Sequence, residues 1–386
     1  MDTIASPGAS NLAPPGSRVA IAQLGDVRSA TLALVCHIDE QDLKRVHSPI
    51  MSPLVWDLGH IAAYEDLWLV HRHGGRELLH PDLADLYDAF ETPRAVRGEI
   101  QALGPAQARD YMSAVSERTA QVLAERGTGD GVLYEMVLRH ELQHSETMRQ
   151  TMDIAGLLCA ADRLRMHEPL AGHETRKGWL EVPAGTLELG ADPDSFAYDN
   201  ERPRHAVELP AFQIARRPVS NSSWLSFSEG GGYEQREWWS DEGWAWRQEQ
   251  DAKRHPAIEE GDPQAPACHV CWFEADAFAR AHGARLPTEA EWERAAKWTQ
   301  LEGKRASELA GIGRVWEWTS SHFQGYPGFQ AYPYREYSQV FFGERYRVLR
   351  GGSWATHPRV KTLTFRNWDL PQRRQIFAGV RLAREA

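Results

Sequence analysis

The sequence predicts an α+β protein with a helical N-terminal domain and a C-terminal domain of short strands. Apolar residues recur at helical spacing from about Val27 to Gly156. From Trp179 onward, short alternating stretches separated by glycine replace that pattern. Most of the 15 tryptophans also lie in this second part, so composition and periodicity change at the same place. We expect a disordered tail at 1–20, a helical bundle at 21–158, a linker at 159–177 and a second domain at 178–386.

Four N-terminal segments justify the bundle. The first lies near 27–47. The second begins at Ser52-Pro53, and Trp56, His60, Tyr64 and Leu67 mark one face of it. The third and fourth are "PAQARDYMSAVSERTAQVLAER" and "GVLYEMVLRHELQHSETMRQTMDIAG". In the C-terminal domain, "GWLEVPAGTLELGAD" predicts a hairpin turning at Ala184-Gly185. Two helices are expected, at 272–282 and at 288–298, the second opened by a capping box of Thr288 and Glu291.

Bulk properties narrow the possible partners. The net charge of -11, from 43 basic and 54 acidic residues, argues against nucleic acid or an anionic membrane surface. No apolar run is as long as a membrane span, and the N-terminus lacks the apolar core of a secretory signal. Four cysteines in 386 residues fit a reducing compartment, so we expect a cytoplasmic protein. Cys268 and Cys271 form a lone CxxC, which we interpret as two buried small residues.

His140 and His144 are four residues apart and therefore share one face of the fourth helix. They interrupt a stripe that should face the bundle core, where an unpartnered imidazole is costly. A metal site explains the pair better than two hydrogen-bonded core histidines. Glu146 points about 200° away from His144 on a helix, so the third ligand should come from elsewhere. His60 on the second helix is a candidate, although it could equally be one more core histidine.

Two other histidines, His37 and His47, are weaker candidates because their surroundings are more polar. Three histidines leave coordination positions open. Zinc would then act as a Lewis acid or a source of hydroxide, and iron(II) would allow oxygen chemistry. The ligand types alone do not choose between the two metals.

Several long motifs resemble the ergothioneine-forming sulfoxide synthases, the EgtB family. They include "SPLVWDLGHIAAYEDLWL", "HELQHSETM", "DNERPRHAVELPAF", "ARLPTEAEWERAA", "YRVLRGGSWAT" and "FRNWDLPQRRQIFAGVRLA", and the resemblance spans nearly all of 30–385. It implies a DinB-like four-helix bundle followed by a formylglycine-generating-enzyme fold, which is related to C-type lectins. It also implies Fe(II) held by His60, His140 and His144.

The implied reaction uses O2 to join sulfur to imidazole C2 of hercynine, the trimethylated betaine of histidine. The sulfur donor is γ-glutamylcysteine or cysteine, and the product is a sulfoxide. By resemblance, Arg94 and Arg97 bind the donor's carboxylates, although a solvated helix-end pair is the plainer interpretation. Asp369 lies at the donor end of the pocket, where it would bind an ammonium group.

The remaining implied residues concern hercynine and oxygen. Trp368 would contact hercynine, and a tryptophan face suits its quaternary ammonium group. Gln143 resembles the residue that positions hercynine. Tyr334 corresponds to a tyrosine near the oxygen site, whose hydroxyl can give a proton, and Tyr337 follows three residues later.

The sequence departs from the family between Trp298 and Trp316, where a longer Gly- and Asn-rich passage is usual. This shortening affects the expected donor more than the iron site. The closely related selenoneine synthases (SenA), which join selenium from a selenosugar to hercynine, are therefore an alternative. A non-catalytic lectin-like binding protein and a zinc-dependent thiol transferase are alternatives of other classes.

Overall fold

The computed structural model describes residues 16–100, 103–170, 177–255, 261–301 and 309–386. The chain divides into two compact units. The bundle unit is Met1–Leu158 with Asp194–Phe196, and the C-terminal unit is Cys159–Pro193 with Ala197–Ala386. Across the described ranges, no helix combines the length and apolar character needed to cross a membrane.

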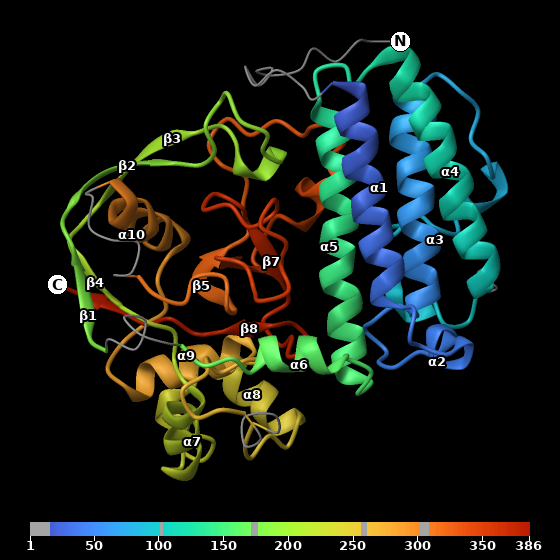
Figure 1. Cartoon of the computed structure of the whole chain (residues 1–386). Helices are drawn as coiled ribbons and strands as arrows, with labels where there is room; N and C mark the ends of the chain where they lie inside the picture. Colours follow the sequence, from blue (N-terminus) through green and yellow to red (C-terminus); the bar gives the residue numbers. More distant parts are fainter. Residues whose placement is uncertain (1–15, 101–102, 171–176, 256–260, 302–308) are drawn as a thin grey trace. The chain divides into compact units, whose positions relative to one another are not determined.

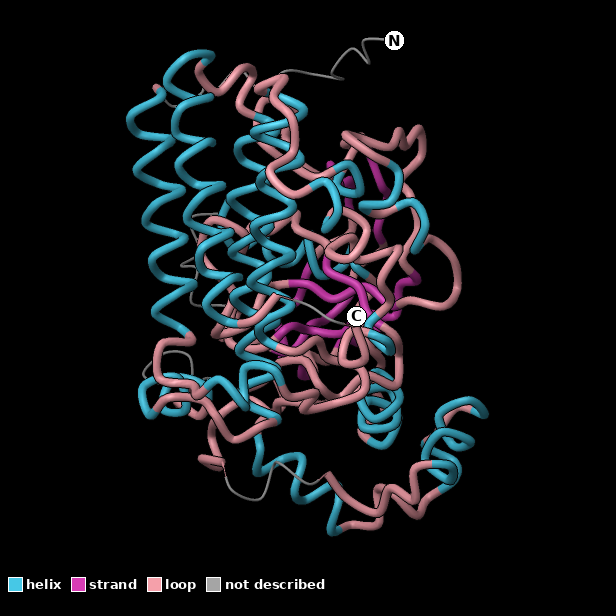
Figure 2. Tube along the Cα trace, turned by 90° about the vertical axis from the view of Figure 1, so that its right-hand side faces the viewer, coloured by secondary structure: helices cyan, strands magenta, loops and turns pink. Residues whose placement is uncertain are grey.

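The bundle unit contains the predicted four long helices, which lie side by side in Figures 1 and 2. They are α1 (Ser17–Leu34), α3 (Leu54–Glu65), α4 (Pro105–Arg126) and α5 (Val132–Ile154), with the short α2 (Glu40–Lys44) after α1. α3 continues as a π-helical segment over Asp66–His73. Segments of this kind are frequent near functional sites.

The first helix differs from the expectation. It begins at Ser17, inside the stretch expected as a tail and ten residues before Val27. Before Val27, only Ala20 and Leu24 mark the buried face of α1, and the next residue on that face is Arg28. Residues 1–15 of the expected tail lie outside the described residues. Within the expected linker, the structure has α6 (Ala160–Met166), and residues 171–176 are outside the described ranges.

The buried Arg28 side chain links all four long helices. Its Nη2 donates to Glu65 on α3 at 2.6 Å, and its Nε donates to Glu141 on α5 at 3.0 Å. Its Nη1 donates to the Met112 carbonyl at 2.8 Å and to the Ser116 hydroxyl at 2.9 Å, both on α4. A buried guanidinium must have its donors satisfied. These bonds meet that requirement and hold α3 and α5 at a fixed spacing.

The described residues of the C-terminal unit form three small sheets. The first has the order β1 (Trp179–Val182), β4 (Phe212–Ala215) and β9 (Ala383–Glu385). The second pairs β2 (Gly185–Leu189) with β3 (His205–Leu209). The third has the order β7 (Asn367–Asp369), β6 (Arg347–Arg350), β5 (Trp316–His322) and β8 (Ala378–Gly379). Only β5 and β8 are parallel among these described strands.

The predicted hairpin at Ala184-Gly185 is wrong. Both strands exist, but β1 pairs with β4 and β2 pairs with β3. The cause lies in the core, because the two strands bury their apolar faces in different places. Leu180 of β1 packs in a cluster with Ile214, whereas Leu187 of β2 packs in one with Tyr326.

Both helices predicted in the C-terminal domain are present, as α9 (Trp272–Ala281) and α10 (Glu289–Leu301). The capping box is confirmed, since the Thr288 hydroxyl accepts from the Glu291 N–H at 3.1 Å and the Glu291 carboxylate accepts from the Thr288 N–H at 2.8 Å. Two further helices were missed, α7 (Asn221–Glu229) and α8 (Asp241–Glu249). Each is capped by the serine before it, a signal that the sequence did contain.

The two cysteines of the CxxC are free thiols, and the prediction that both are buried is wrong for Cys268, which is half-buried. Cys271 is fully buried, and burial raises the pKa of its thiol well above the ordinary value. A thiol with a raised pKa carries little thiolate and is a poor nucleophile or metal ligand. The expected shortening between Trp298 and Trp316 falls partly on residues 302–308, outside the described ranges.

Candidate metal centre and predicted substrate residues

Three histidines converge inside the bundle unit. His60 comes from α3, and His140 and His144 come from successive turns of α5. One ring nitrogen from each lies within 4.8 Å of the other two. The Nε2 atoms of His60 and His140 are only 3.1 Å apart. Three imidazole nitrogens gathered in this way match the protein ligand set of a mononuclear metal centre.

Hydrogen bonds fix two of the rings. The Nδ1 of His60 lies 2.6 Å from the carbonyl oxygen of Tyr87, and the Nδ1 of His144 lies 3.2 Å from Oδ1 of Asp57. Both Nδ1 atoms therefore donate, which leaves the Nε2 lone pairs for a metal. Asp57 is 1% exposed, and its Oδ2 has no hydrogen-bond partner among the described residues. Its position three residues before His60 places both on one face of α3, which was a signal that the sequence analysis missed.

Desolvation sets the protonation of His60 and His140. Desolvation is the largest cause that lowers the pKa of His60 and of His140 well below the usual 6.5. The nearby charge of His144 adds to both shifts, and the Arg94 and Arg97 guanidiniums lower the pKa of His60 further. Both imidazoles are thus neutral at neutral pH, the form that binds metals. The residues present therefore fit a divalent transition metal.

Aromatic rings support the same histidines. The Trp56 ring stacks on His60 with 4.8 Å between centroids, and the Tyr64 ring stacks on His140 at 3.7 Å. The other proposed ligands lie elsewhere. The Nε2 of His37 lies 3.0 Å from the Leu157 carbonyl, and the Nε2 of His47 lies 2.9 Å from the Asp42 carbonyl. Glu146 is buried but is not in the cluster, as helix geometry predicts.

The two arginines predicted to bind the donor differ in environment. Arg94 is exposed in a short 3-10 turn. Arg97 is buried, with its guanidinium 3.6 Å from the centroid of the Trp56 ring. Its three nitrogens donate to the Thr92 carbonyl at 2.9 Å, the Ser52 hydroxyl at 2.8 Å and the Ala89 carbonyl at 3.2 Å. Desolvation lowers the pKa of Arg97 to about 10, so it stays charged at neutral pH.

Gln143 lies on α5 between the two metal-site histidines and is half-buried. Its Nε2 donates to the Arg139 carbonyl at 3.3 Å. The other four predicted site residues belong to the C-terminal unit, where Tyr334, Tyr337 and Trp368 contribute to an aromatic cluster. The Trp368 ring stacks on Phe323 with 4.2 Å between centroids, and Tyr337 meets it edge-on at 6.1 Å.

Tyr334 meets Tyr337 edge-on at 6.1 Å, so the three predicted residues lie in one chain of ring contacts. Asp369 follows Trp368 on β7 and is half-buried. Its carboxylate pairs with Arg373 at 3.4 Å and accepts the Leu370 N–H at 2.8 Å. This aspartate already has a cationic neighbour, a feature that the sequence analysis did not anticipate.

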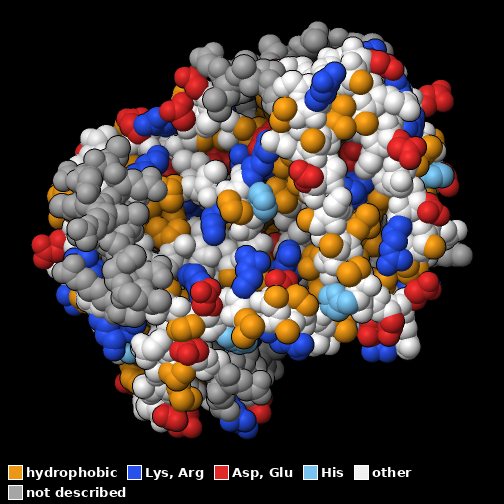
Figure 3. Space-filling model, in the orientation of Figure 1, with side chains coloured by type: hydrophobic (Ala, Val, Ile, Leu, Met, Phe, Trp, Pro, Cys, Tyr) orange, Lys and Arg blue, Asp and Glu red, His pale blue; other side chains and the backbone are white. Residues whose placement is uncertain are grey.

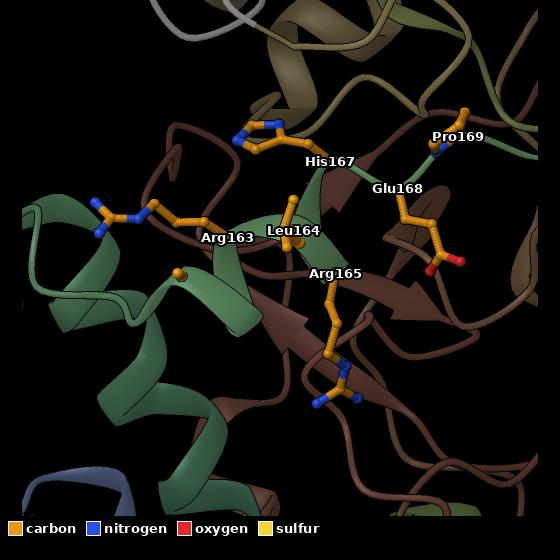
Figure 4. Close-up of a pocket in the computed structure, with 7 residues that line it drawn as sticks. Arg163, Leu164, Arg165, His167, Glu168 and Pro169 are labelled. Atoms are coloured by element: carbon orange, nitrogen blue, oxygen red, sulfur yellow. The ribbon is translucent and has the colours of Figure 1, made fainter.

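On the face drawn in Figure 3, the acidic, basic and apolar side chains of the described residues are interspersed. A hollow along α6 is lined by residues that all lie between Ala160 and Pro169, and Figure 4 shows Arg163 and Arg165 pointing in different directions there. Leu164 at its centre is 75% exposed. None of the predicted site residues lines the hollow, so the histidine triad remains the candidate site.

Comparisons with known proteins agree with this division. Residues 23–148 match the DinB superfamily, and residues 168–311 and 309–386 match the sulfatase-modifying factor enzyme 1-like domain. A hercynine oxygenase of Mycolicibacterium thermoresistibile is 41% identical over 94% of this chain and 93% of its own length. One of Mycobacterium tuberculosis is 40% identical over 93% and 97%. A formylglycine-generating enzyme of Thermomonospora curvata is 32% identical over 38% of this chain and 59% of its own length. The chain belongs to the hercynine oxygenase family.

Proposed function

We propose that this protein is a hercynine oxygenase with a single nonheme iron(II). It would join the sulfur of γ-glutamylcysteine or cysteine to imidazole C2 of hercynine in ergothioneine biosynthesis. The observation that carries the proposal is the convergence of His60, His140 and His144 within 4.8 Å, in a chain of this family. Iron(II) is preferred to zinc because the reaction needs O2 as a four-electron oxidant.

The proposed reaction is balanced. Hercynine gives up its C2 hydrogen, the thiol gives up its S–H hydrogen, and a C–S bond forms. One atom of O2 becomes the sulfoxide oxygen, and the other leaves as water with the two hydrogens. Bound iron would supply the redox chemistry with O2, and the chain's own residues would bind, orient and protonate. His60, His140 and His144 would hold the iron through Nε2, with Asp57 and the Tyr87 carbonyl fixing two of the rings.

Trp368 would contact the trimethylammonium group of hercynine, and a role in positioning hercynine is proposed separately for Gln143. Trp368 is half-buried, with Phe323 stacked on it and Tyr337 and Phe341 against the same ring. Its indole would bind the trimethylammonium group through the π system. Tyr334, in the same aromatic cluster, would donate and accept protons during turnover. Orientation of hercynine by these groups would supply part of the rate through proximity.

The donor site is assigned mainly to Arg94. A guanidinium binds a carboxylate in a bidentate fashion, and Arg94 is the more exposed of the two predicted arginines. Arg97 is engaged with Thr92, Ser52 and Ala89, so its main role would be to hold the loop that presents Arg94. Asp369 would bind the donor's ammonium group in competition with Arg373.

The test is reconstitution of the purified protein with iron(II) or zinc(II), followed by assay with hercynine and O2. Consumption of hercynine with γ-glutamylcysteine or cysteine, only in the iron form, is the expected result. Activity in the zinc form would favour a thiol transferase. Consumption of a selenosugar, with neither thiol accepted, would replace the sulfur donor by a selenium donor.

A further inference from the structure

We propose that Asp199 is a positioning residue. It fixes the loop that carries Tyr334 and Tyr337 in place relative to the strand that carries Trp368. The inference rests on the proposed function, because it assigns Asp199 a role through those three residues. Asp199 opens a 3-10 turn over Asp199–Glu201, more than 130 positions away from the loop in the chain.

The Asp199 carboxylate accepts hydrogen bonds from both ends of the loop. Its Oδ1 accepts from the Ser338 hydroxyl at 2.5 Å, just after Tyr337. Its Oδ2 accepts from the Tyr332 N–H at 3.3 Å, two residues before Tyr334. The preceding residue adds a third contact, since the Tyr198 ring stacks on Tyr337 with 4.4 Å between centroids.

The same turn also holds the Trp368 strand. The Arg366 guanidinium donates to the Asn200 carbonyl at 2.6 Å, and the Thr364 hydroxyl donates to the Glu201 carboxylate at 2.6 Å. Arg366 is itself fixed at its other nitrogens, which donate to Glu289 on α10 at 2.7 and 2.9 Å. A single three-residue turn therefore connects the two segments that carry Tyr334, Tyr337 and Trp368.

Stability alone does not account for a carboxylate at this position. Asp199 is 4% exposed and forms no ion pair among the described residues. Its neighbour Glu201 is also acidic and raises the pKa of Asp199 further. Burial is the largest cause that raises its pKa to about 6, opposed by the bonds from Ser338 and Tyr332. Keeping such a group ionised costs folding free energy at neutral pH. Perturbed carboxylates of this kind concentrate at functional sites.

The experiment compares Asp199→Ala, Asp199→Asn and the control Asp192→Asn in the iron-loaded, full-length enzyme. Asp192 is an exposed aspartate seven positions earlier in the chain, with Arg204 3.6 Å from its carboxylate. We expect Asp199→Ala to lower kcat about 10- to 100-fold, as for a displaced catalytic group, with bound iron per chain unchanged. Hydrogen exchange of the 332–341 peptide should become faster. Asp199→Asn should be intermediate, since its amide keeps one acceptor oxygen, and the control should match the native enzyme.

Ser338→Ala provides a second variant that leaves the carboxylate in place. It should also speed exchange of the 332–341 peptide, and Asp199→Ala/Ser338→Ala should be no worse than the more damaged single variant. Unchanged exchange in Asp199→Ala would overturn the inference whatever the activity. If the native enzyme is active and Asp199→Ala keeps kcat within twofold, the role of Asp199 is refuted and the proposed function stands. An inactive native enzyme would instead overturn the proposed function.

Discussion

The Nε2 atoms of His60 and His140 lie 3.1 Å apart, although the two residues are 80 positions apart in the chain. The Nδ1 of His60 donates to the Tyr87 carbonyl, so its Nε2 bears a lone pair directed at His140. Two imidazoles brought this close, one buried and one half-buried, need a shared proton or a shared cation between them. The third histidine, His144, within the same 4.8 Å makes a metal the better explanation.

The triad can be tested ligand by ligand. Replacing His60, His140 or His144 with alanine should abolish iron binding and turnover, with helical content by circular dichroism unchanged. Asp57→Asn should weaken iron affinity about 10- to 100-fold, because the His144 ring loses its carboxylate partner. Glu146→Ala is the matched control and should bind iron like the native protein. Loss of iron in Glu146→Ala, with iron retained in His60→Ala, would refute the ligand assignment.

The cation site can be tested at Trp368. Trp368→Ala should raise KM for hercynine by about 5- to 30-fold, which corresponds to about 1–2 kcal/mol for a desolvated cation–π contact. Trp244→Ala, a half-buried tryptophan outside the proposed site, should leave KM unchanged. Histidine, which lacks the methyl groups, should be a poor substrate of the native enzyme. Equal turnover of histidine and hercynine would contradict a site built for a quaternary ammonium.

The two arginines should behave differently when removed. Arg94→Ala should raise KM for γ-glutamylcysteine, by the equivalent of about 1.5–3 kcal/mol for a lost charged hydrogen bond, with an unchanged melting temperature. Arg97→Ala should lower the melting temperature, because it removes three internal hydrogen bonds and the contact with Trp56. Thermal melts and donor kinetics on both variants decide the matter. A stable Arg97→Ala with the larger KM effect would reverse the two roles.

Asp199 should make folding stability depend on pH. Its pKa is about 6 in the folded protein, above the usual 3.8. Its contribution therefore favours folding below about pH 4 and is lost as the pH rises through about 6. Asp199→Asn has no such proton, so it should gain stability relative to the native protein as pH rises from 4.5 to 7.5. The gain should approach about 2 kcal/mol, since about 1.5 pKa units separate pH 4.5 from the pKa of about 6 and one unit is worth about 1.4 kcal/mol. The measurement is the free energy of unfolding in urea as a function of pH for both proteins. Two parallel curves would rule this prediction out.

The bundle was predictable because helix periodicity is local. The spacing of His140 and His144 placed both on one face of a helix. The same helix geometry excluded Glu146 as a metal ligand. Strand pairing was not predictable in this way. β1 and β2 are joined by a tight turn, yet their partners are decided by core clusters built from distant segments.

The site shows the same contrast. Asp57 could have been identified, because it lies three residues before His60 on one helix. Asp199 could not, because Tyr332 and Ser338 are 133 and 139 positions away and no local pattern relates them. The internal hydrogen bonds of Arg97 could not be predicted either, because they depend on how an irregular loop folds back on Trp56.

The Arg28 side chain makes metal affinity and bundle stability thermodynamically linked. Glu141, which it binds, directly follows His140, and Glu65 lies five residues after His60 on the other ligand helix. A metal bound by the triad draws together the same two helices that this guanidinium ties. Binding to the folded state alone would add about 2.7 kcal/mol at a metal concentration 100 times the Kd. Conversely, weakening the Arg28 contacts would let the distances between the three histidines vary more. The affinity of the triad for a metal would therefore fall as the bundle becomes less stable.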